Sequence, residues 1–176
     1  MKRIETEFEG LLIFEPTVHQ DARGYFMESY RAEHFKGITF IQDNEASSSY
    51  GVIRGLHYQE PPYAQTKLLR VLEGRILDVV VDLRSASPTF GKAYAIELSA
   101  ENKKQLLVPK GFAHGYAVLS EKATVLYKVD AYYNAAADRG IFYDDFEVDL
   151  QIPASERILS DKDLKQPRLN QIKSPF

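Results

Sequence analysis

Residues 51–83, GVIRGLHYQEPPYAQTKLLRVLEGRILDVVVDL, decide the fold. Three runs in this stretch are rich in branched aliphatic and aromatic residues, namely Val52–Gln59, Lys67–Leu72 and Arg75–Leu83. Such runs, separated by turn residues, are typical of β-strands. Only Glu73-Gly74 stands between the second and third runs, which predicts a tight hairpin connection there.

The last of these runs alternates with the period of a strand. One face carries only apolar side chains, those of Leu77, Val79, Val81 and Leu83. The opposite face carries Ile76, Asp78, Val80 and Asp82. Side chains two residues apart lie on the same face of a strand, so we expect the wholly apolar face to belong to the core.

Outward from this stretch, the same pattern recurs along the chain and the helical signal is weak. Six further strands are predicted, at Leu11–Glu15, Tyr25–Tyr30, Ala93–Leu98, Gln105–Pro109, Tyr116–Leu119 and Thr124–Ala131. Short helices are expected at Ser29–Phe35, Ala100–Lys103 and Ser160–Leu164. We therefore predict one all-β domain over residues 1–176, a sandwich or barrel. The tail after Pro153 should pack along the barrel or reach across a partner subunit.

Composition excludes several classes of function. The 176 residues include 22 basic and 25 acidic side chains, a net charge of −3, so no basic field favours nucleic acid or an anionic membrane. Cysteine is absent, which rules out disulfides and thiolate chemistry. The amino terminus lacks a signal peptide's apolar segment, and no apolar run is long enough to span a bilayer. We expect a soluble cytoplasmic protein.

Two histidines stand in informative contexts. His114 completes a P-x-G-x-x-H turn in PKGFAHG, which resembles one of the two signature motifs of the cupin superfamily. Metal-binding cupins carry H-x-H in the other motif, but here the chain has His57-Tyr58-Gln59, and Lys67 stands near the place of a liganding Glu. A charged ammonium has no lone pair for a cation. We therefore expect no metal, and a pocket suited to an anion.

Several longer segments together resemble the dTDP-4-dehydrorhamnose 3,5-epimerase family over nearly the whole chain. They are DARGYFMESY, QDNEASSSYGVIRGLHYQEPPYAQTKLLRVLEG, RILDVVVDLRSASPTFG, LLVPKGFAHGYAVLS and LSDKD. The resemblance implies a cupin or jelly-roll barrel with short peripheral helices and a homodimer. It also implies cofactor-free conversion of dTDP-4-dehydro-6-deoxy-D-glucose into dTDP-4-dehydro-L-rhamnose, toward dTDP-rhamnose.

The resemblance also implies catalytic roles. His57 matches the general base, and Asp163 matches the carboxylate that orients it, although Asp161 stands nearby. Lys67 matches the cation beside the enolate oxygen, although a strand lysine can equally be a surface residue. Tyr133 matches the acid on the far face of the sugar; it follows Tyr132, and we expect strand alternation to turn one of the two inward.

Further positions match the substrate-binding residues of the family. Arg23 and Arg54 match the diphosphate ligands, although Arg23 could simply pair with Asp21. The remaining matches contact the nucleotide or the sugar, and some of them act across a dimer interface in the family: Phe26, Glu28, Gln42, Asn44 and His114.

Three alternatives stay open. Relatives with the same His, Lys and Asp invert only C3 or only C5 of the sugar. A metal-dependent cupin oxygenase or isomerase is disfavoured by Gln59 and Lys67. A non-catalytic sugar-binding cupin is disfavoured by the presence of both His57 and Asp163, because a binding protein needs no oriented base.

Overall fold

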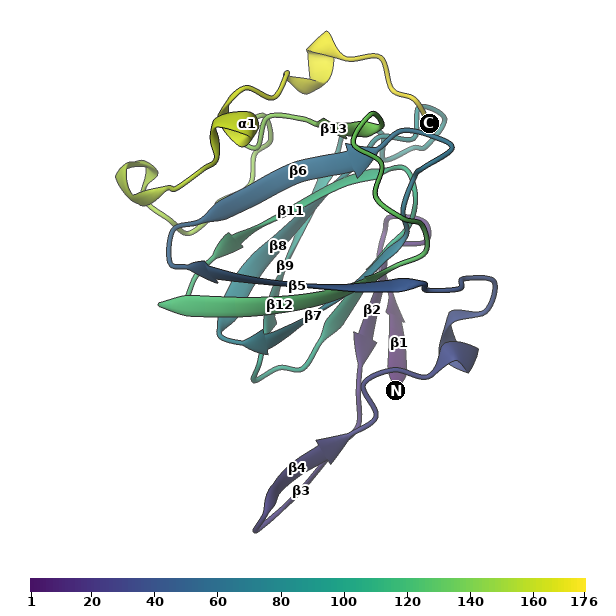
Figure 1. The fold of residues 1–176 in the computed structure, drawn as a ribbon, viewed down its shortest axis with the longest axis vertical. Helices are drawn as coiled ribbons and strands as arrows, with labels where there is room; N and C mark the ends of the chain where they lie inside the picture. Colours follow the sequence, from purple (N-terminus) through teal and green to yellow (C-terminus); the bar gives the residue numbers. More distant parts are fainter.

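The computed structural model describes residues 1–176, and Figure 1 shows that strands make up most of it. One sheet has six strands in the order β1 (Lys2–Glu5), β2 (Leu12–Glu15), β10 (Gln105–Val108), β7 (Lys67–Glu73), β12 (Lys122–Val129) and β5 (Gln42–Ser49). A second sheet has five, in the order β13 (Asp138–Gly140), β6 (Ile53–Gln59), β11 (Phe112–Val118), β8 (Arg75–Asp82) and β9 (Ala93–Ser99). All strand pairings within these two sheets are antiparallel, and the sheets face each other, which confirms the predicted all-β jelly roll.

The predicted hairpin at Glu73-Gly74 is wrong. Strand β7 pairs with β10 and β12, whereas β8 pairs with β11 and β9, so the turn carries the chain from one sheet to the other. Gly74 has φ +74, and a Cβ there would lie 2.0 Å from the backbone oxygen of Lys122. Because glycine has no Cβ and adopts positive φ readily, Gly74 allows both this close approach and the sharp corner.

Strand β8 is buried on both faces. The predicted core face, Leu77, Val79, Val81 and Leu83, packs under the carboxy-terminal segment, in a cluster that reaches Leu159, Ile172 and Phe176. This contact shows that the tail packs along the barrel. The opposite face lies inside the barrel, where Ile76 and Val80 join the larger core cluster and Asp78 and Asp82 are fully buried.

Most predicted strands are present with shifted ends, and β11 begins at Phe112 rather than at Tyr116. Strands β1, β3, β5 and β13 are not predicted, because their sequences contain few of the branched aliphatic and aromatic residues typical of strands. The helix at Ser160–Leu164 is confirmed as α1 (Asp161–Leu164), capped by the Ser160 side chain. The helix predicted at Ser29–Phe35 shrinks to the 3-10 turn η1 (Ala32–Phe35), and residues 100–102 form a turn rather than a helix. Two more 3-10 turns, η2 (Ala154–Glu156) and η3 (Leu169–Gln171), lie in the tail.

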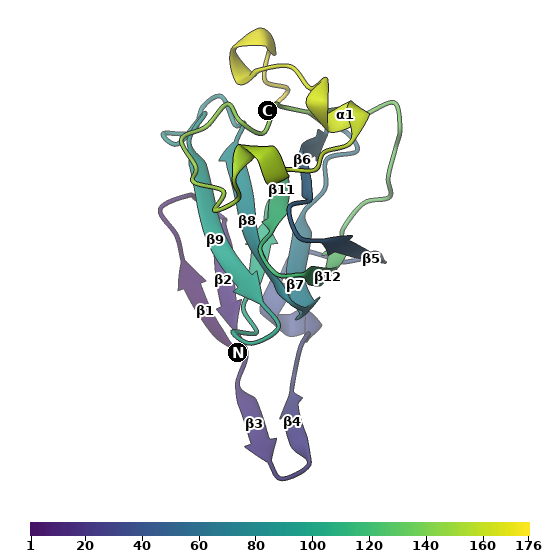
Figure 2. The same cartoon turned by 90° about the vertical axis from the view of Figure 1, so that its left-hand side faces the viewer.

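A two-stranded ribbon of β3 (Val18–Asp21) and β4 (Gly24–Met27) pairs with no other strand. Figures 1 and 2 both show it projecting away from the barrel. Nearly all of its side chains are exposed, including the aromatic ring of Phe26, which is 72% exposed. None of the helices has the length and apolar character needed to cross a bilayer.

Candidate active site

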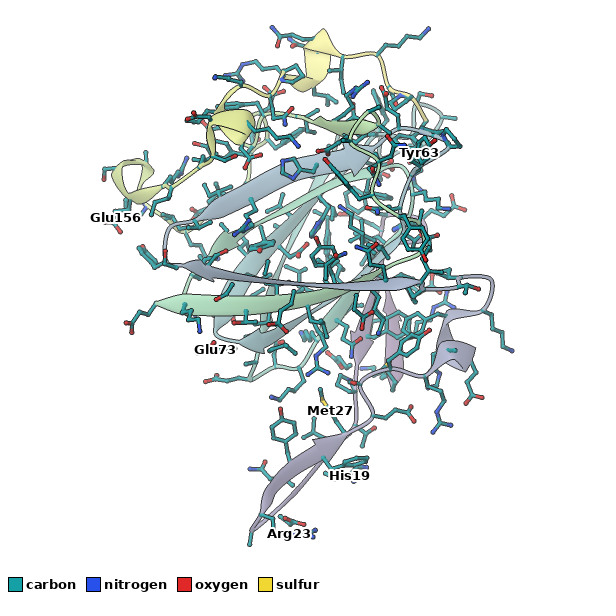
Figure 3. All side chains as sticks on the ribbon, in the orientation of Figure 1. His19, Arg23, Met27, Tyr63, Glu73 and Glu156 are labelled. Carbon is teal, nitrogen blue, oxygen red and sulfur yellow. The ribbon has the colours of Figure 1, made fainter.

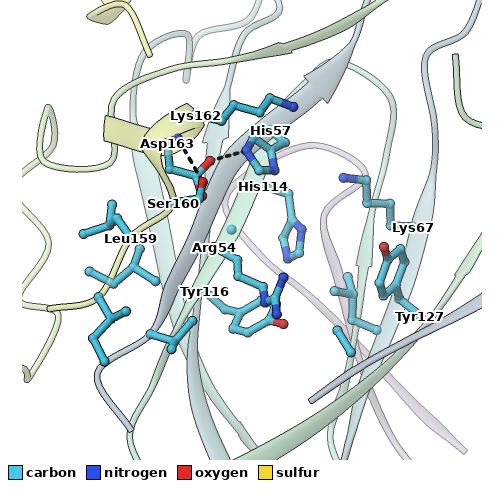
Figure 4. A pocket seen from close by; sticks show the side chains of 16 residues that line it. Arg54, His57, Lys67, His114, Tyr116, Tyr127, Leu159, Ser160, Lys162 and Asp163 are labelled. Atoms are coloured by element: carbon cyan, nitrogen blue, oxygen red, sulfur yellow. Dashed lines mark hydrogen bonds and ion pairs between the residues drawn. The ribbon is translucent and has the colours of Figure 1, made fainter. Parts of the chain in front are cut away.

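A cavity of about 510 Å³ opens between the two sheets. Its polar lining includes Arg54, His57, Lys67, His114, Tyr127 and Asp163 (Figure 4). Arg54 and His57 come from β6 and His114 from β11, all in the five-stranded sheet. Lys67 on β7 and Tyr127 on β12 come from the six-stranded sheet, so the two groups of side chains face each other across the cavity.

His57 is paired with a buried carboxylate. Its Nε2 lies 2.5 Å from Oδ1 of Asp163, which is 4% exposed, whereas Asp161 is exposed to solvent. The Ser160 hydroxyl donates to Oδ2 of Asp163 at 2.9 Å and accepts from its backbone N–H at 3.1 Å. Burial alone would raise the pKa of Asp163, but its hydrogen bonds with His57 and Ser160 and the nearby positive charge lower it. The carboxylate is therefore held charged and oriented on the imidazole.

Lys67 makes no hydrogen bond and no ion pair. Burial lowers its pKa from 10.5 to about 8, although the charges of Asp78 and Asp138 act in the opposite direction. Near neutral pH it presents a positive charge to the cavity without a direct partner. Such a charge can stabilise negative charge that develops on an oxygen of a bound molecule.

Two tyrosines lie near His57, in different surroundings. Tyr127 lines the main cavity, and burial raises the pKa of its phenol, so the group keeps its proton. Tyr133 is 60% exposed, and its hydroxyl donates to Asp138 at 3.0 Å. It lines a smaller adjoining cavity of about 230 Å³, which His57, Lys67 and Tyr127 also border.

The prediction that alternation turns either Tyr132 or Tyr133 inward is wrong. Strand β12 ends at Val129, so both tyrosines lie in the following loop, and both are exposed. Sequence reasoning missed Tyr127 as a candidate. The signal available was its place inside the strand, two residues from Val129 on the same face.

The second histidine and Gln59 have their own partners. His114 is buried, and its Nε2 lies 2.9 Å from Oδ2 of Asp78. Gln59, in the place of the second histidine of H-x-H, donates to the backbone oxygen of Tyr63 and accepts from the backbone N–H of Asn134. No three His, Cys, Asp or Glu side chains come together in a group that could hold a metal ion.

The predicted binding residues divide between two places. Gln42 donates to Asn44 at 2.7 Å on β5, and both border the smaller cavity. Arg54 stands in the main cavity, where its Nε donates to the hydroxyl of Ser48 at 2.9 Å.

The other three lie on or beside the projecting ribbon and away from both cavities. Arg23 pairs with Asp21 at the tip, where Figure 3 shows it far from the barrel. Phe26 lies along the ribbon, and Glu28, at its base, pairs with Arg31. Within one chain, this structure does not bring these three residues to His57.

The cavity thus combines an oriented imidazole on one wall with a cation and a protonated phenol on the opposite wall. An imidazole without a proton on its free nitrogen can remove a proton from carbon, and the cation can hold the resulting oxyanion. The phenol can deliver a proton from the other side. A base, a cation and a proton donor in this arrangement can together invert a carbon next to a carbonyl group.

Comparison with known proteins gives one consistent result. Residues 5–171 match the family described as dTDP-4-dehydrorhamnose 3,5-epimerase. The protein of that name from Shigella flexneri is 48% identical over 169 residues, covering 93% of each chain. The crystal structure of the enzyme from Elizabethkingia anophelis superposes with a TM-score of 0.91 at 48% identity, covering 97% of each chain. The Legionella pneumophila enzyme, solved with dTDP-4-keto-L-rhamnose, gives a TM-score of 0.93 at 41% identity, covering 98% of this chain and 94% of that one.

Proposed function

The chain belongs to the dTDP-4-dehydrorhamnose 3,5-epimerase family, and from this premise we propose how its pocket carries out the reaction. The reaction is the conversion of dTDP-4-dehydro-6-deoxy-D-glucose into dTDP-4-dehydro-L-rhamnose in dTDP-rhamnose biosynthesis. The observation that carries the proposal is the oriented His57–Asp163 pair facing Lys67 and Tyr127 across one cavity.

His57 removes the proton from the carbon beside the C4 ketone. The electron pair of that C–H bond moves into a carbon–carbon double bond, and the ketone oxygen becomes an enolate oxygen. Lys67 stabilises this oxygen with its positive charge, while Asp163 stabilises the imidazolium that forms on His57. Since C3 and C5 both adjoin the ketone, the same residues serve both carbons in turn.

Inversion requires the new proton to arrive from the opposite face. We assign this step to Tyr127, because it lies on the sheet opposite His57 and burial keeps its phenol protonated. The resemblance favoured Tyr133 for this role. Its exposed position and its hydrogen bond to Asp138 instead suit a contact with the nucleotide at the mouth of the barrel.

Arg54 is the diphosphate ligand within the cavity, since its guanidinium makes no ion pair and offers donors in the fork that suits phosphate oxygens. Arg23, Phe26 and Glu28 are too remote to bind the same molecule from the same chain. We therefore propose a homodimer in which the β3–β4 ribbon of one copy reaches the cavity of the other. A two-fold axis would complete both sites at once.

The test is NMR of dTDP-4-dehydro-6-deoxy-D-glucose with the enzyme in heavy water. Deuterium should enter at C3 and at C5 with inversion at both, and His57→Asn should abolish exchange at both while leaving dTDP binding nearly intact. Exchange at only one carbon would make the chain a single-site epimerase. Near wild-type exchange in His57→Asn would exclude His57 as the base. Prolonged chelation should leave turnover unchanged, because Lys67 supplies the positive charge at the oxyanion.

A further inference from the structure

Tyr116 on β11 carries a buried hydroxyl without a partner. The residue is 6% exposed and lines the main cavity. Only two buried side-chain polar atoms in the structure make no hydrogen bond, the Tyr116 hydroxyl oxygen and Oδ1 of Asp78. A phenyl ring would fill the same space without leaving a polar group unsatisfied, so the hydroxyl requires an explanation.

The neighbours of Tyr116 are fixed by strand register. Arg54 on β6 and Asp78 on β8 are its direct cross-strand partners, one on each side. Directly opposed residues of antiparallel strands project from the same face of the sheet. Figure 4 shows the tyrosine and the arginine side chain in the same part of the cavity. Ser48 also approaches the hydroxyl, but not with the distance and angle of a hydrogen bond.

The chemistry of these neighbours indicates what is missing. A guanidinium has only donors, so Arg54 cannot accept a hydrogen bond from the phenol. Asp78 holds His114 through Oδ2, and its Oδ1 makes no hydrogen bond with the Tyr116 hydroxyl although the two residues are cross-strand partners. Arg54 and Tyr116 are thus two donors from adjacent strands, and the group that satisfies both is an acceptor, best a negatively charged oxygen.

We propose that the Tyr116 hydroxyl donates a hydrogen bond to the phosphate group that Arg54 binds, which makes Tyr116 a further diphosphate-binding residue of this enzyme. The inference rests on the proposed function, since it takes Arg54 as a diphosphate ligand. Arg54 is exposed and its side chain is held by one hydrogen bond, to Ser48. This single bond leaves the guanidinium able to turn toward a phosphate in the cavity that Tyr116 also lines.

The experiment compares Tyr116→Phe with the unaltered protein by calorimetry with dTDP. Losing one hydrogen bond to a charged group should weaken dTDP binding roughly ten-fold or more. Because dTDP has no hexose, a loss cannot come from contacts to the sugar. The melting temperature of the unliganded variant should stay the same or rise, because a buried polar group without a partner has been removed.

Tyr94→Phe is the matched control, since Tyr94 packs against Phe8 in the core and should leave dTDP affinity unchanged. Unchanged dTDP affinity in Tyr116→Phe, with a clear loss in Arg54→Ala, would overturn this inference and leave the proposed diphosphate site intact. A lower melting temperature with unchanged affinity would assign the hydroxyl to an internal bridge toward Asp78 instead. Unchanged affinity in both variants would remove the diphosphate site itself.

Discussion

Lys67 illustrates how a group that we propose for catalysis can weaken the fold. Its pKa is about 8 in the folded protein, against 10.5 for an ordinary lysine, because burial disfavours the charged form. Below about pH 8 the folded state must hold a buried charge. Between about 8 and 10.5 the unfolded chain binds more protons than the folded one, so this group makes stability rise with pH across that window.

Replacing this lysine by methionine should therefore stabilise the protein and abolish turnover. The increase in melting temperature of Lys67→Met over wild type should be largest near pH 7 and should shrink toward pH 10. The exposed Lys92→Met is the control and should show no such dependence. In the unaltered enzyme, turnover should fall above about pH 8, where the ammonium loses its proton. A constant difference in melting temperature between pH 7 and 10 would contradict the argument.

Tyr127→Phe should separate proton exchange from inversion. His57 can still form the enolate, and a single base can return deuterium only to the face from which it took the proton. Exchange should persist at one carbon at least, while net epimerisation falls by about 10²- to 10⁴-fold, as expected for loss of a general acid. Both are read in the same NMR sample. Tyr133→Phe is the matched variant, and if it alone blocked inversion, the acid would be Tyr133.

The short helix α1 holds the carboxylate that pairs with His57. Its cap, Ser160, binds both the backbone and the side chain of Asp163, and Figure 4 shows these contacts beside His57. Lys162 of the same helix pairs with Asp138 on β13, which ties the helix to the mouth of the barrel. The helix is thus positioned by its own cap, by the Lys162–Asp138 ion pair and by the contact of Asp163 with His57.

Ser160→Ala should lower kcat with little change in dTDP affinity, because it releases Asp163 without touching the nucleotide site. Ser160→Thr should retain most of the activity, since threonine caps helices in the same way. Asp161→Asn alters the exposed carboxylate of the same turn and should be nearly neutral. The measurements are steady-state kinetics and calorimetry; equal activity of Ser160→Ala and wild type would show that Asp163 needs no such support.

The projecting ribbon has consequences for the assembled protein. If the ribbon completes the partner's active site, each active site needs His57 from one copy and Arg23 and Phe26 from the other. Two inactive variants, His57→Asn and the double variant Arg23→Ala/Phe26→Ala, should then complement each other. Mixed dimers contain one intact site, so unfolding and refolding an equal mixture should restore about a quarter of wild-type activity in a random C2 dimer.

Sedimentation or light scattering of the same samples should show dimers throughout. A mixture that stays inactive although mixed dimers form would place both sets of residues in the same subunit's site. The control is each variant refolded alone, which should recover no activity.

The sequence by itself determined the local features that depend on near neighbours in the chain. The period of two in Arg75–Leu83 predicts a buried strand, and Ser160 before DKDL predicts a capped helix. The family resemblance carried by GLHYQ, Lys67 and LSDKD pointed to His57, Lys67 and Asp163, which the fold brings to one cavity. In each case the prediction depends on a few neighbouring residues or on a sequence motif taken as a unit.

The tertiary structure alone decided the features that depend on which strands pair. The sequence does not encode locally that β7 and β8 enter different sheets, since a two-residue connection suits a hairpin equally well. That Tyr127 lines the cavity whereas Tyr133 lies in an exposed loop follows from where β12 ends, and the ribbon's distance from the cavity follows from its having no strand partner. Pairing brings together residues far apart in sequence, and periodicity shows which face of a strand is buried without showing what lies opposite it.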